Sequence, residues 1–267
     1  MLDLEDKINI LKRNYSVVKD TRLILPYIYK TLNDNILTFL TEEAVLNPFS
    51  DNCDIFNELY DFLYKNEVIG LLTKQEAKTL YLLSKELQDL PEPIIEVGTH
   101  LGFSTIFLAK NKYIYAVDNQ FNGQLKIVDG LFRDFFRYFY ENHESISKNI
   151  LDDDIKVDVC QRHWKIAGVT DNIKTICQDA IKAVDYLPEA SMVFYDANHD
   201  YDMVDDLDAY FLKIVPGGIL AIHDFNQRTH GVVGAVYDFY KRNKNVLEGP
   251  FLTDSLIWFK KIIKDLL

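Results

Sequence analysis

The sequence predicts an α/β protein whose core is a doubly wound, mostly parallel sheet of seven strands with an antiparallel edge. The first observation is a set of short apolar runs, such as residues 94–97, which are typical of strands buried in a parallel sheet. The second is the alternation of these runs with glycine turns and amphipathic segments, as in βαβ units. The third is strand-like character in residues 251–263 after a polar interruption at 243–249, which predicts two antiparallel edge strands.

Length, composition and charge limit the class of protein. The chain has 267 residues, 48% of them hydrophobic, which is enough for one large domain with a sizeable core. Its net charge of -12 disfavours a surface that neutralises phosphates, so we expect no nucleic-acid partner. The start of the chain is acidic, no run approaches ~18 apolar residues, and three cysteines form no C-x-x-C pair. These features predict a cytoplasmic protein without a membrane span.

Residues 1–75 are predicted to form an N-terminal helical cap, and residues 76–267 to form the main domain. Apolar residues recur at helical spacing in the cap, for example over residues 55–64. Thr73 and Glu76 have the spacing of a capping box, which predicts a helix that begins there and ends before Pro91.

The strand at residues 94–97 is followed by a turn that contains Gly98 and Gly102, and then by a helix capped near Ser104. Glycine lets a backbone approach a ligand closely, and a helix N-terminus offers unpaired N–H groups. A second apolar run ends at Asp118, where an acid is placed to accept hydrogen bonds from ribose hydroxyls. The turn lacks the third glycine of the dinucleotide fingerprint, which counts against NAD.

An aromatic-rich segment follows, and we treat residues 121–160 as a lid-like insertion. It is longer than an ordinary connection and contains a predicted helix at 131–140. It predicts either an active-site lid or a contact in a homo-oligomer, and the sequence leaves both open. Further strands are predicted at 173–179, 191–196 and 219–222.

Acidic residues end the predicted parallel strands, where ligands bind in doubly wound sheets. Unpaired buried carboxylates are costly, so we expect some of them to meet ligand hydroxyls, an amine or a cation. The residues at these positions are Glu96, Asp118, Asp179, Asp196, His223 and Asp224.

The ordered motifs resemble those of a known family. They are the glycine turn with Glu96 and Asp118, the stretch 193–201 (VFYDANHDY) and the stretch 216–224 (PGGILAIHD). Over residues 76–263 the chain resembles class I S-adenosylmethionine-dependent methyltransferases with a Rossmann-like fold. It is similar in particular to the macrocin and mycinamicin sugar O-methyltransferases and to cephalosporin-hydroxylase-like proteins.

This resemblance implies roles for individual residues. It implies S-adenosylmethionine as cofactor and a small-molecule hydroxyl, on a sugar or another natural product, as methyl acceptor. His199 corresponds to the general base, beside Asp196, and imidazole can take a proton near neutral pH. The implied ligands of a divalent ion, Mg²⁺ or Mn²⁺, are Asp196, His223 and Asp224. His223 stands where relatives carry an acid, so either it favours Mn²⁺, Fe²⁺ or Zn²⁺ or it is not a ligand, and both alternatives stay open. The implied cofactor residues are Glu96, Gly98, Thr99, Gly102, Ser104, Asp118, Asp179 and Ala180.

Three alternatives stay open at this point. The protein can be an NAD-dependent or sugar-nucleotide enzyme on a similar fold, or an S-adenosylmethionine-binding protein without catalysis. It can also methylate nitrogen rather than oxygen, which makes a metal and a base less necessary.

Overall fold

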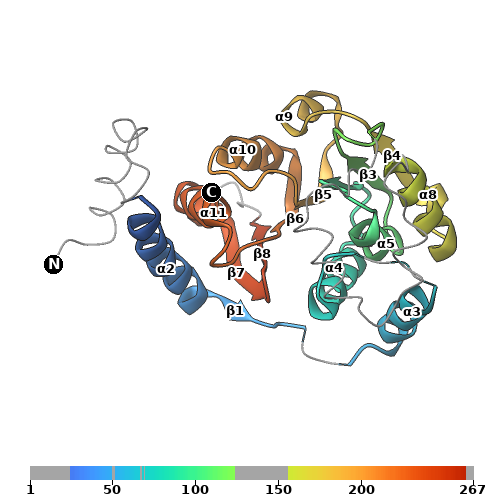
Figure 1. Cartoon of the computed structure of the whole chain (residues 1–267), viewed down its shortest axis with the longest axis horizontal. Helices are drawn as coiled ribbons and strands as arrows, with labels where there is room; N and C mark the ends of the chain where they lie inside the picture. The colour runs from blue at the N-terminus through green and yellow to red at the C-terminus, as the bar shows by residue number, and fades with distance from the viewer. Residues whose placement is uncertain (1–24, 50–51, 67, 69, 124–155, 263–267) are drawn as a thin grey trace.

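A computed structural model describes residues 25–49, 52–66, 68, 70–123 and 156–262 (Figure 1). Its centre is one mixed sheet with the strand order β1-β7-β8-β6-β5-β2-β3-β4. The strands are β1 (Val45–Leu46), β2 (Ile94–Val97), β3 (Ile114–Val117), β4 (Ile173–Ile176), β5 (Ala190–Tyr195), β6 (Ile214–Ile222), β7 (Leu247–Thr253) and β8 (Leu256–Lys261).

The predicted class is confirmed. Strands β2 to β6 pair in parallel, and β8 is antiparallel to both β6 and β7. The sheet has one strand more than the seven expected, because β1 from the predicted helical cap pairs in parallel with β7. A segment of two residues is too short for a periodic pattern, so this strand was not predicted.

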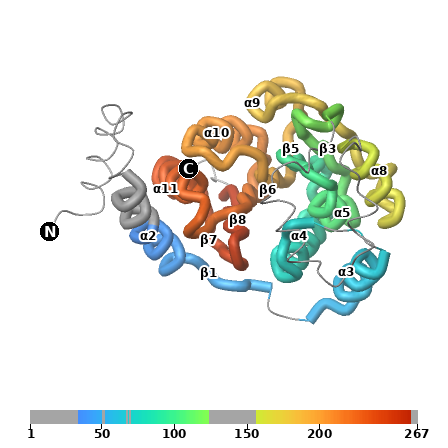
Figure 2. Tube along the Cα trace, viewed as in Figure 1, coloured from blue at the N-terminus to red at the C-terminus, as the bar shows by residue number. Residues whose placement is uncertain are grey.

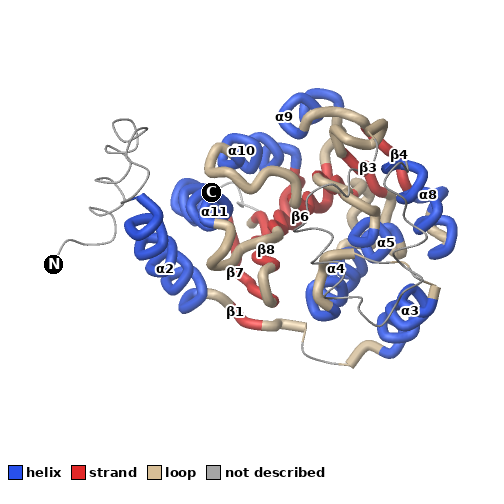
Figure 3. The backbone as a smooth tube through the Cα atoms, in the orientation of Figure 1, coloured by secondary structure: helices blue, strands red, loops and turns tan. Residues whose placement is uncertain are grey.

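Helices cover both faces of the sheet (Figure 3). They are α2 (Leu25–Glu43), α3 (Asp54–Lys65), α4 (Lys74–Glu86), α5 (Phe103–Ala109), α8 (Lys156–Ala167), α9 (Ala180–Ala183), α10 (Met203–Lys213) and α11 (His230–Asn243). Short 3₁₀ turns lie at Thr170–Asn172, Val184–Tyr186 and Lys244–Val246. One hydrophobic cluster joins α2, α10 and α11 to one sheet face, and a second joins α3, α4, α5 and α8 to the other.

The strand alternation sends neighbouring side chains into different clusters. In β2, Ile95 and Val97 belong to the first cluster, whereas Ile94 belongs to the second. Because side chains alternate along a strand, Glu96 shares the face of Ile94, on which α5 packs. The alternation of side chains along β2 therefore directs the Glu96 carboxylate toward α5.

The described N-terminal helices pack on the sheet domain. Figure 2 shows the blue helix α2 beside the orange-red helix α11, although they are far apart in sequence. The rings of Phe39 and Tyr237 meet edge to face at 6.0 Å. On the other face, the α3 ring of Phe56 lies 5.6 Å from that of Phe107. The described part of residues 1–75 therefore contributes to both clusters; its standing as a separate cap stays a prediction.

Some boundaries differ from those expected. Strand β6 begins at Ile214, five residues before the predicted start, and runs through Pro216. Glycine at position 218 allows the backbone to lie close to β5 there, since a Cβ at Gly218 would lie 2.6 Å from Ser191 O. The two ends of the predicted insertion are joined by hydrogen bonds from Lys156 N to Gly123 O (3.0 Å) and from Val157 N to Phe121 O (3.1 Å). The helix predicted at 131–140 lies outside the described residues.

No helix in the described part of the chain is both long enough and apolar enough to cross a membrane.

Candidate active site at the carboxyl ends of the strands

The glycine turn after β2 has the backbone conformation that its glycines allow. Gly98 has φ +90°, and a Cβ there would lie 2.0 Å from the backbone oxygen of Asp196. Gly102 has φ +76°, and its Cβ would lie 2.5 Å from Trp164 Nε1. A side chain at either position would be strained and would clash. Both glycines are thus required by contacts within the chain.

Helix α8 holds this turn from outside. Three of its side chains meet three consecutive turn carbonyls: Cys160 Sγ donates to His100 O (3.3 Å), and Trp164 Nε1 donates to Gly102 O (3.0 Å). Between them, His163 Nδ1 lies 2.9 Å from Leu101 O. No role in the site was predicted for these α8 residues, because their partners are backbone atoms about 60 positions away in the chain.

Glu96 is fully buried and ties β2 to α5. Its carboxylate accepts hydrogen bonds from Ser104 Oγ (2.6 Å) and Thr105 Oγ1 (2.5 Å). Burial raises the pKa of Glu96 to about 7, although the two hydroxyls act in the opposite direction. The structure thus gives Glu96 partners inside the protein and places Ser104, the second residue of α5, against it. The predicted hydroxyl cap near Ser104 is wrong: Gly102 is the N-cap of α5, and the Ser104 hydroxyl donates to Glu96 instead.

Asp118 lies at the tip of β3, as predicted, and is nearly buried. It forms an ion pair with Lys156 Nζ at 2.5 Å and accepts hydrogen bonds from the backbone N–H groups of His100 (3.1 Å) and Gln120 (2.8 Å). The sequence pointed to the acid and missed Lys156. The strand predicted at 173–179 is shorter, because β4 ends at Ile176 and Asp179 is the N-cap of α9. Ala180, the first residue of α9, accepts a hydrogen bond from Tyr210 at its carbonyl oxygen (2.8 Å). Neither bonds to the glycine turn or to Asp118 within the described residues.

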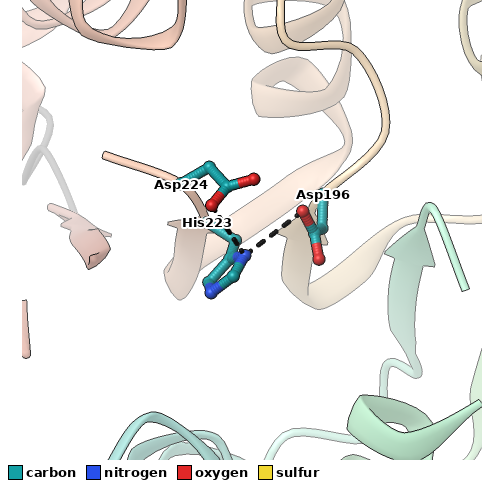
Figure 4. A group of neighbouring side chains, drawn as sticks. All are labelled: Asp196, His223 and Asp224. Atoms are coloured by element: carbon teal, nitrogen blue, oxygen red, sulfur yellow. Dashed lines mark ion pairs between the residues drawn. The ribbon is translucent and has the colours of Figure 1, made fainter. Parts of the chain in front are cut away.

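A second cluster forms where β5 and β6 end (Figure 4). His223 Nδ1 faces both carboxylates, at 3.3 Å from Asp196 Oδ1 and 3.7 Å from Asp224 Oδ1. His199 Nε2 lies 2.8 Å from Asp224 Oδ2 and 3.7 Å from Asp196 Oδ1. The structure therefore brings together all four residues that the sequence singled out here.

Backbone strain helps to aim one of these carboxylates. Asp224 has φ +60°, a left-handed conformation that is unusual for a residue other than glycine. Its carbonyl accepts hydrogen bonds from the hydroxyl of Thr229 and from Asn226 N (2.9 Å), which hold the turn. Such outliers are typical of functional sites.

Glu76, in α4, contacts the cluster on the side of the His223 ring opposite Asp196 and Asp224, and this contact was not predicted. The structure confirms the capping box, since Thr73 Oγ1 accepts from Glu76 N and Thr73 N donates to Glu76 Oε2 (2.8 Å). The same carboxylate lies 3.4 Å from His223 Nε2. The pattern located the helix start, but a local motif cannot show a partner 147 positions away.

The charges in the cluster hold one another in their ionised forms. Burial opposes the charged ring of His223, but Asp196 and Glu76 outweigh it and raise its pKa to about 11. Burial likewise opposes ionisation of Glu76, yet His223 lowers the pKa of Glu76 to about 2. Hydrogen bonds to Asp196 and Asp224 raise the pKa of His199 to about 10.

The donor set suits a divalent cation. One ligand atom from each of Asp196, His223 and Asp224 can be chosen so that all three lie within 4.8 Å of one another. Two carboxylates and one imidazole are donors that Mn²⁺ and related ions accept.

A small cavity connects this cluster with the glycine turn. Its volume is about 40 Å³, and its walls include Gly98, Thr99, Ser104 and Asp196. The buried hydroxyl of Thr99 lies beside Glu96, whose pKa it helps to lower, but it forms no hydrogen bond of normal geometry among the described residues. Its hydrogen-bonding capacity is therefore not fully used inside the protein, which fits a wall for a polar ligand.

Comparison with known proteins gives a match to a sequence family and a set of solved structures with the same fold. Residues 95–225 match a sequence family described as a methyltransferase domain, which confirms the resemblance to methyltransferases; a search of curated proteins gives no match. The O-methyltransferase NovP has 12% identity and a TM-score of 0.53, over 88% of this chain and 100% of NovP. Cofactor-bound Rv0187 from MTB has 13% identity and a TM-score of 0.51, over 82% and 94%. A protein from Corynebacterium glutamicum has 11% identity and a TM-score of 0.51, over 88% and 99%.

Proposed function

We propose that this protein transfers a methyl group from S-adenosylmethionine to a hydroxyl group of a small molecule, with the help of a divalent cation. The match of residues 95–225 to a sequence family described as a methyltransferase domain supports the proposal. A sugar or another hydroxylated natural product is the acceptor class. NovP, with the same fold, is described as an O-methyltransferase, which agrees with oxygen as the acceptor atom.

One observation carries this proposal: the cavity that has the glycine turn on one side and Asp196 on the other. The turn is the expected place of the cofactor, with Gly98, Thr99, Gly102 and Ser104 near its methionine part. Asp196 belongs to the cluster that contains the expected base. A methyl donor held by the turn would therefore lie next to the groups that prepare the acceptor, and positioning of this kind supplies much of the rate in group transfer.

We assign the sugar of the cofactor to Asp118, and its adenine to the start of α9 at Asp179 and Ala180. Asp118 offers a carboxylate at a strand tip, where ribose hydroxyls are commonly bound. Its ion pair with Lys156 means that a ribose must share or displace that ammonium group. We assign Glu96 an indirect role: the hydrogen bonds that it accepts from Ser104 and Thr105 hold α5 against the glycine turn.

His199 is the group that takes the acceptor proton. It is 45% exposed, so a substrate can reach it, and it lies beside Asp196 and Asp224. With a pKa near 10 the ring is protonated at neutral pH, and a protonated imidazole cannot accept a proton. The cause of the raised pKa is the pair of carboxylates, so any group that neutralises them restores the base. The acceptor oxygen then bonds to the methyl carbon, the methyl–sulfur bond breaks, and the proton ends on His199.

The residues that would hold the cation are Asp196, His223 and Asp224. When bound, a divalent ion lowers the pKa of a coordinated hydroxyl and neutralises these carboxylates. The imidazole makes Mn²⁺ a better candidate than Mg²⁺.

Calorimetric titration of S-adenosylmethionine tests the cofactor site, with the wild type and Asp118→Asn measured side by side. We expect micromolar binding by the wild type and a loss of at least tenfold in the variant. Equal titrations with EDTA separate cofactor binding from cation binding. Absence of binding in all these titrations would refute the methyltransferase assignment; binding without methyl transfer to any hydroxylated acceptor in the presence of Mn²⁺ would favour a binding protein without catalysis.

A further inference from the structure

We propose that Glu76 is a positioning residue that holds the His223 ring with Nδ1 directed at the cation site, and so makes the site prefer a transition-metal ion over Mg²⁺. This inference rests on the proposed function, because it takes Asp196, His223 and Asp224 as the ligands of a divalent cation. Glu76 belongs to α4, outside the motifs that indicated the site.

The two ring nitrogens of His223 face different partners. Nδ1 faces Asp196 and Asp224 at 3.3 Å and 3.7 Å (Figure 4 shows the Nδ1 side). Nε2 faces two oxygens at 3.4 Å, Glu76 Oε2 and Ser255 Oγ, and the Ser255 hydroxyl donates its proton to Glu76 Oε1. The side chain of His223 is 7% exposed and that of Glu76 is 1% exposed. Phe194 lies against the ring with its centroid 6.4 Å away. The ring thus sits between the acidic pair on one side and one buried carboxylate on the other.

Glu76 is itself fixed from three directions. Its Oε2 accepts a hydrogen bond from Thr73 N (2.8 Å). Its Oε1 accepts two from Ser255, one from the backbone N (2.8 Å) and one from Oγ (2.7 Å). A helix cap needs only the bond from Thr73. The bonds from Ser255, in the turn between β7 and β8, orient the carboxylate independently of the helix, and with it the edge that faces His223.

The chemistry of an imidazole ligand explains why a carboxylate suits this place. A ring nitrogen that binds a cation carries no proton, so the other nitrogen must carry it. An ionised carboxylate can only accept hydrogen bonds, so Glu76 favours the proton on Nε2 and leaves the lone pair of Nδ1 on the side of Asp196 and Asp224. A carboxylate behind a metal-bound histidine commonly fixes its tautomer in this way, and its loss typically weakens metal binding 10–100-fold.

Glu76→Gln is the decisive variant, because the amide keeps the shape but can donate to Nε2 and so allow the wrong tautomer. Thr73→Ala is the matched control: it removes the Thr73 hydroxyl from the capping box and leaves the Glu76 carboxylate in place. Affinities for Mn²⁺ and for Mg²⁺ are measured separately, by electron paramagnetic resonance and by calorimetry, on the full-length chain. S-adenosylmethionine affinity is measured on the same samples.

We expect Glu76→Gln to bind Mn²⁺ 10–100-fold more weakly than the wild type and Mg²⁺ less than threefold more weakly. Thr73→Ala keeps Mn²⁺ affinity within twofold. If Glu76→Gln does not fold, Ser255→Ala replaces it. This variant removes the hydroxyl bond to Glu76 Oε1 together with the oxygen that lies 3.4 Å from His223 Nε2, so it weakens the support of the ring, and we expect a three- to tenfold loss for Mn²⁺ alone.

Three results would overturn the inference. The first is equal Mn²⁺ affinity in the wild type and the Glu76 variant, and the second is equal losses for Mn²⁺ and Mg²⁺, which indicate a general structural effect. The third is absence of cation binding in the wild type. These results concern cation binding only. The methyltransferase proposal is tested separately, and it would be refuted if the protein did not bind S-adenosylmethionine.

Discussion

The two halves of the strand-end surface are built differently. Around the glycine turn, polar groups are matched at hydrogen-bonding distance: Glu96 with two hydroxyls, Asp118 with Lys156, and the turn carbonyls with α8. At the ends of β5 and β6, two imidazoles and two carboxylates face one another, and most of their contacts are long, at 3.3–3.7 Å. In the first region the polar side chains are already hydrogen-bonded to one another. In the second, the long contacts between imidazoles and carboxylates can be replaced by bonds to a cation.

Removing the proposed base tests whether the second region carries the chemistry. His199→Gln is expected to lower kcat 10²–10⁴-fold, because proton transfer by a positioned side chain contributes about that much. S-adenosylmethionine affinity, measured by calorimetry, should change less than twofold. Tyr201→Phe is the control, since the Tyr201 hydroxyl donates to Asp238 and lies outside the cluster. Full activity in His199→Gln would assign proton removal to another group.

Removing one charge from the first region tests whether its pairing is structural. Asp118→Asn leaves Lys156 buried without its partner, and breaking a buried ion pair from one side costs about 3–5 kcal/mol. We expect a loss of this size in the free energy of urea unfolding. The double variant with Lys156→Met should recover part of it; a single variant as stable as the wild type would show that the pair contributes nothing.

The buried carboxyl of Glu96 predicts a pH dependence. Its pKa is about 7 in the folded protein against 4.5 unfolded, so the stability that it contributes is present below about pH 4.5 and is lost as the pH rises through 7. The shift corresponds to about 3 kcal/mol. Glu96→Gln should abolish this loss, so the variant gains on the wild type between pH 4.5 and 8. Parallel unfolding curves at both pH values would contradict the assignment.

The smallest effect is expected from the helix cap. Thr73→Ala removes the hydroxyl that accepts from Glu76 N, which should cost about 1 kcal/mol in thermal or urea unfolding. Catalytic activity should stay near that of the wild type. A large loss of activity would mean that the cap and the position of Glu76 cannot be separated.

The sequence predicted what depends on local pattern. The strand at residues 94–97, the capping box at Thr73, and the acids at the ends of β3, β5 and β6 appear as expected, because periodicity and spacing encode them directly. Asp179 does not end a strand, since β4 stops at Ile176. Strand β1 was missed, since two residues carry no period.

Partners across the fold could not be predicted in the same way. Three contacts of the site join segments that only tertiary packing brings together: Lys156 with Asp118, Trp164 with the glycine turn, and Glu76 with His223. A lone lysine or tryptophan has the same local pattern whether it packs in a core or completes a site. Only the three-dimensional arrangement distinguishes the two.

Strand β1 also changes how the molecule can be shortened. The backbone of β7 would otherwise lie open at the border of the sheet, where unpaired N–H and C=O groups are templates for association with a second chain. Val45 and Leu46 pair with Phe251 and Leu252, and Asn47 N donates to Leu252 O (2.8 Å). Trimming the chain past Asn47 would uncover this border and would also remove α2 from the first hydrophobic cluster, so a truncation that keeps the protein soluble has to begin before α2.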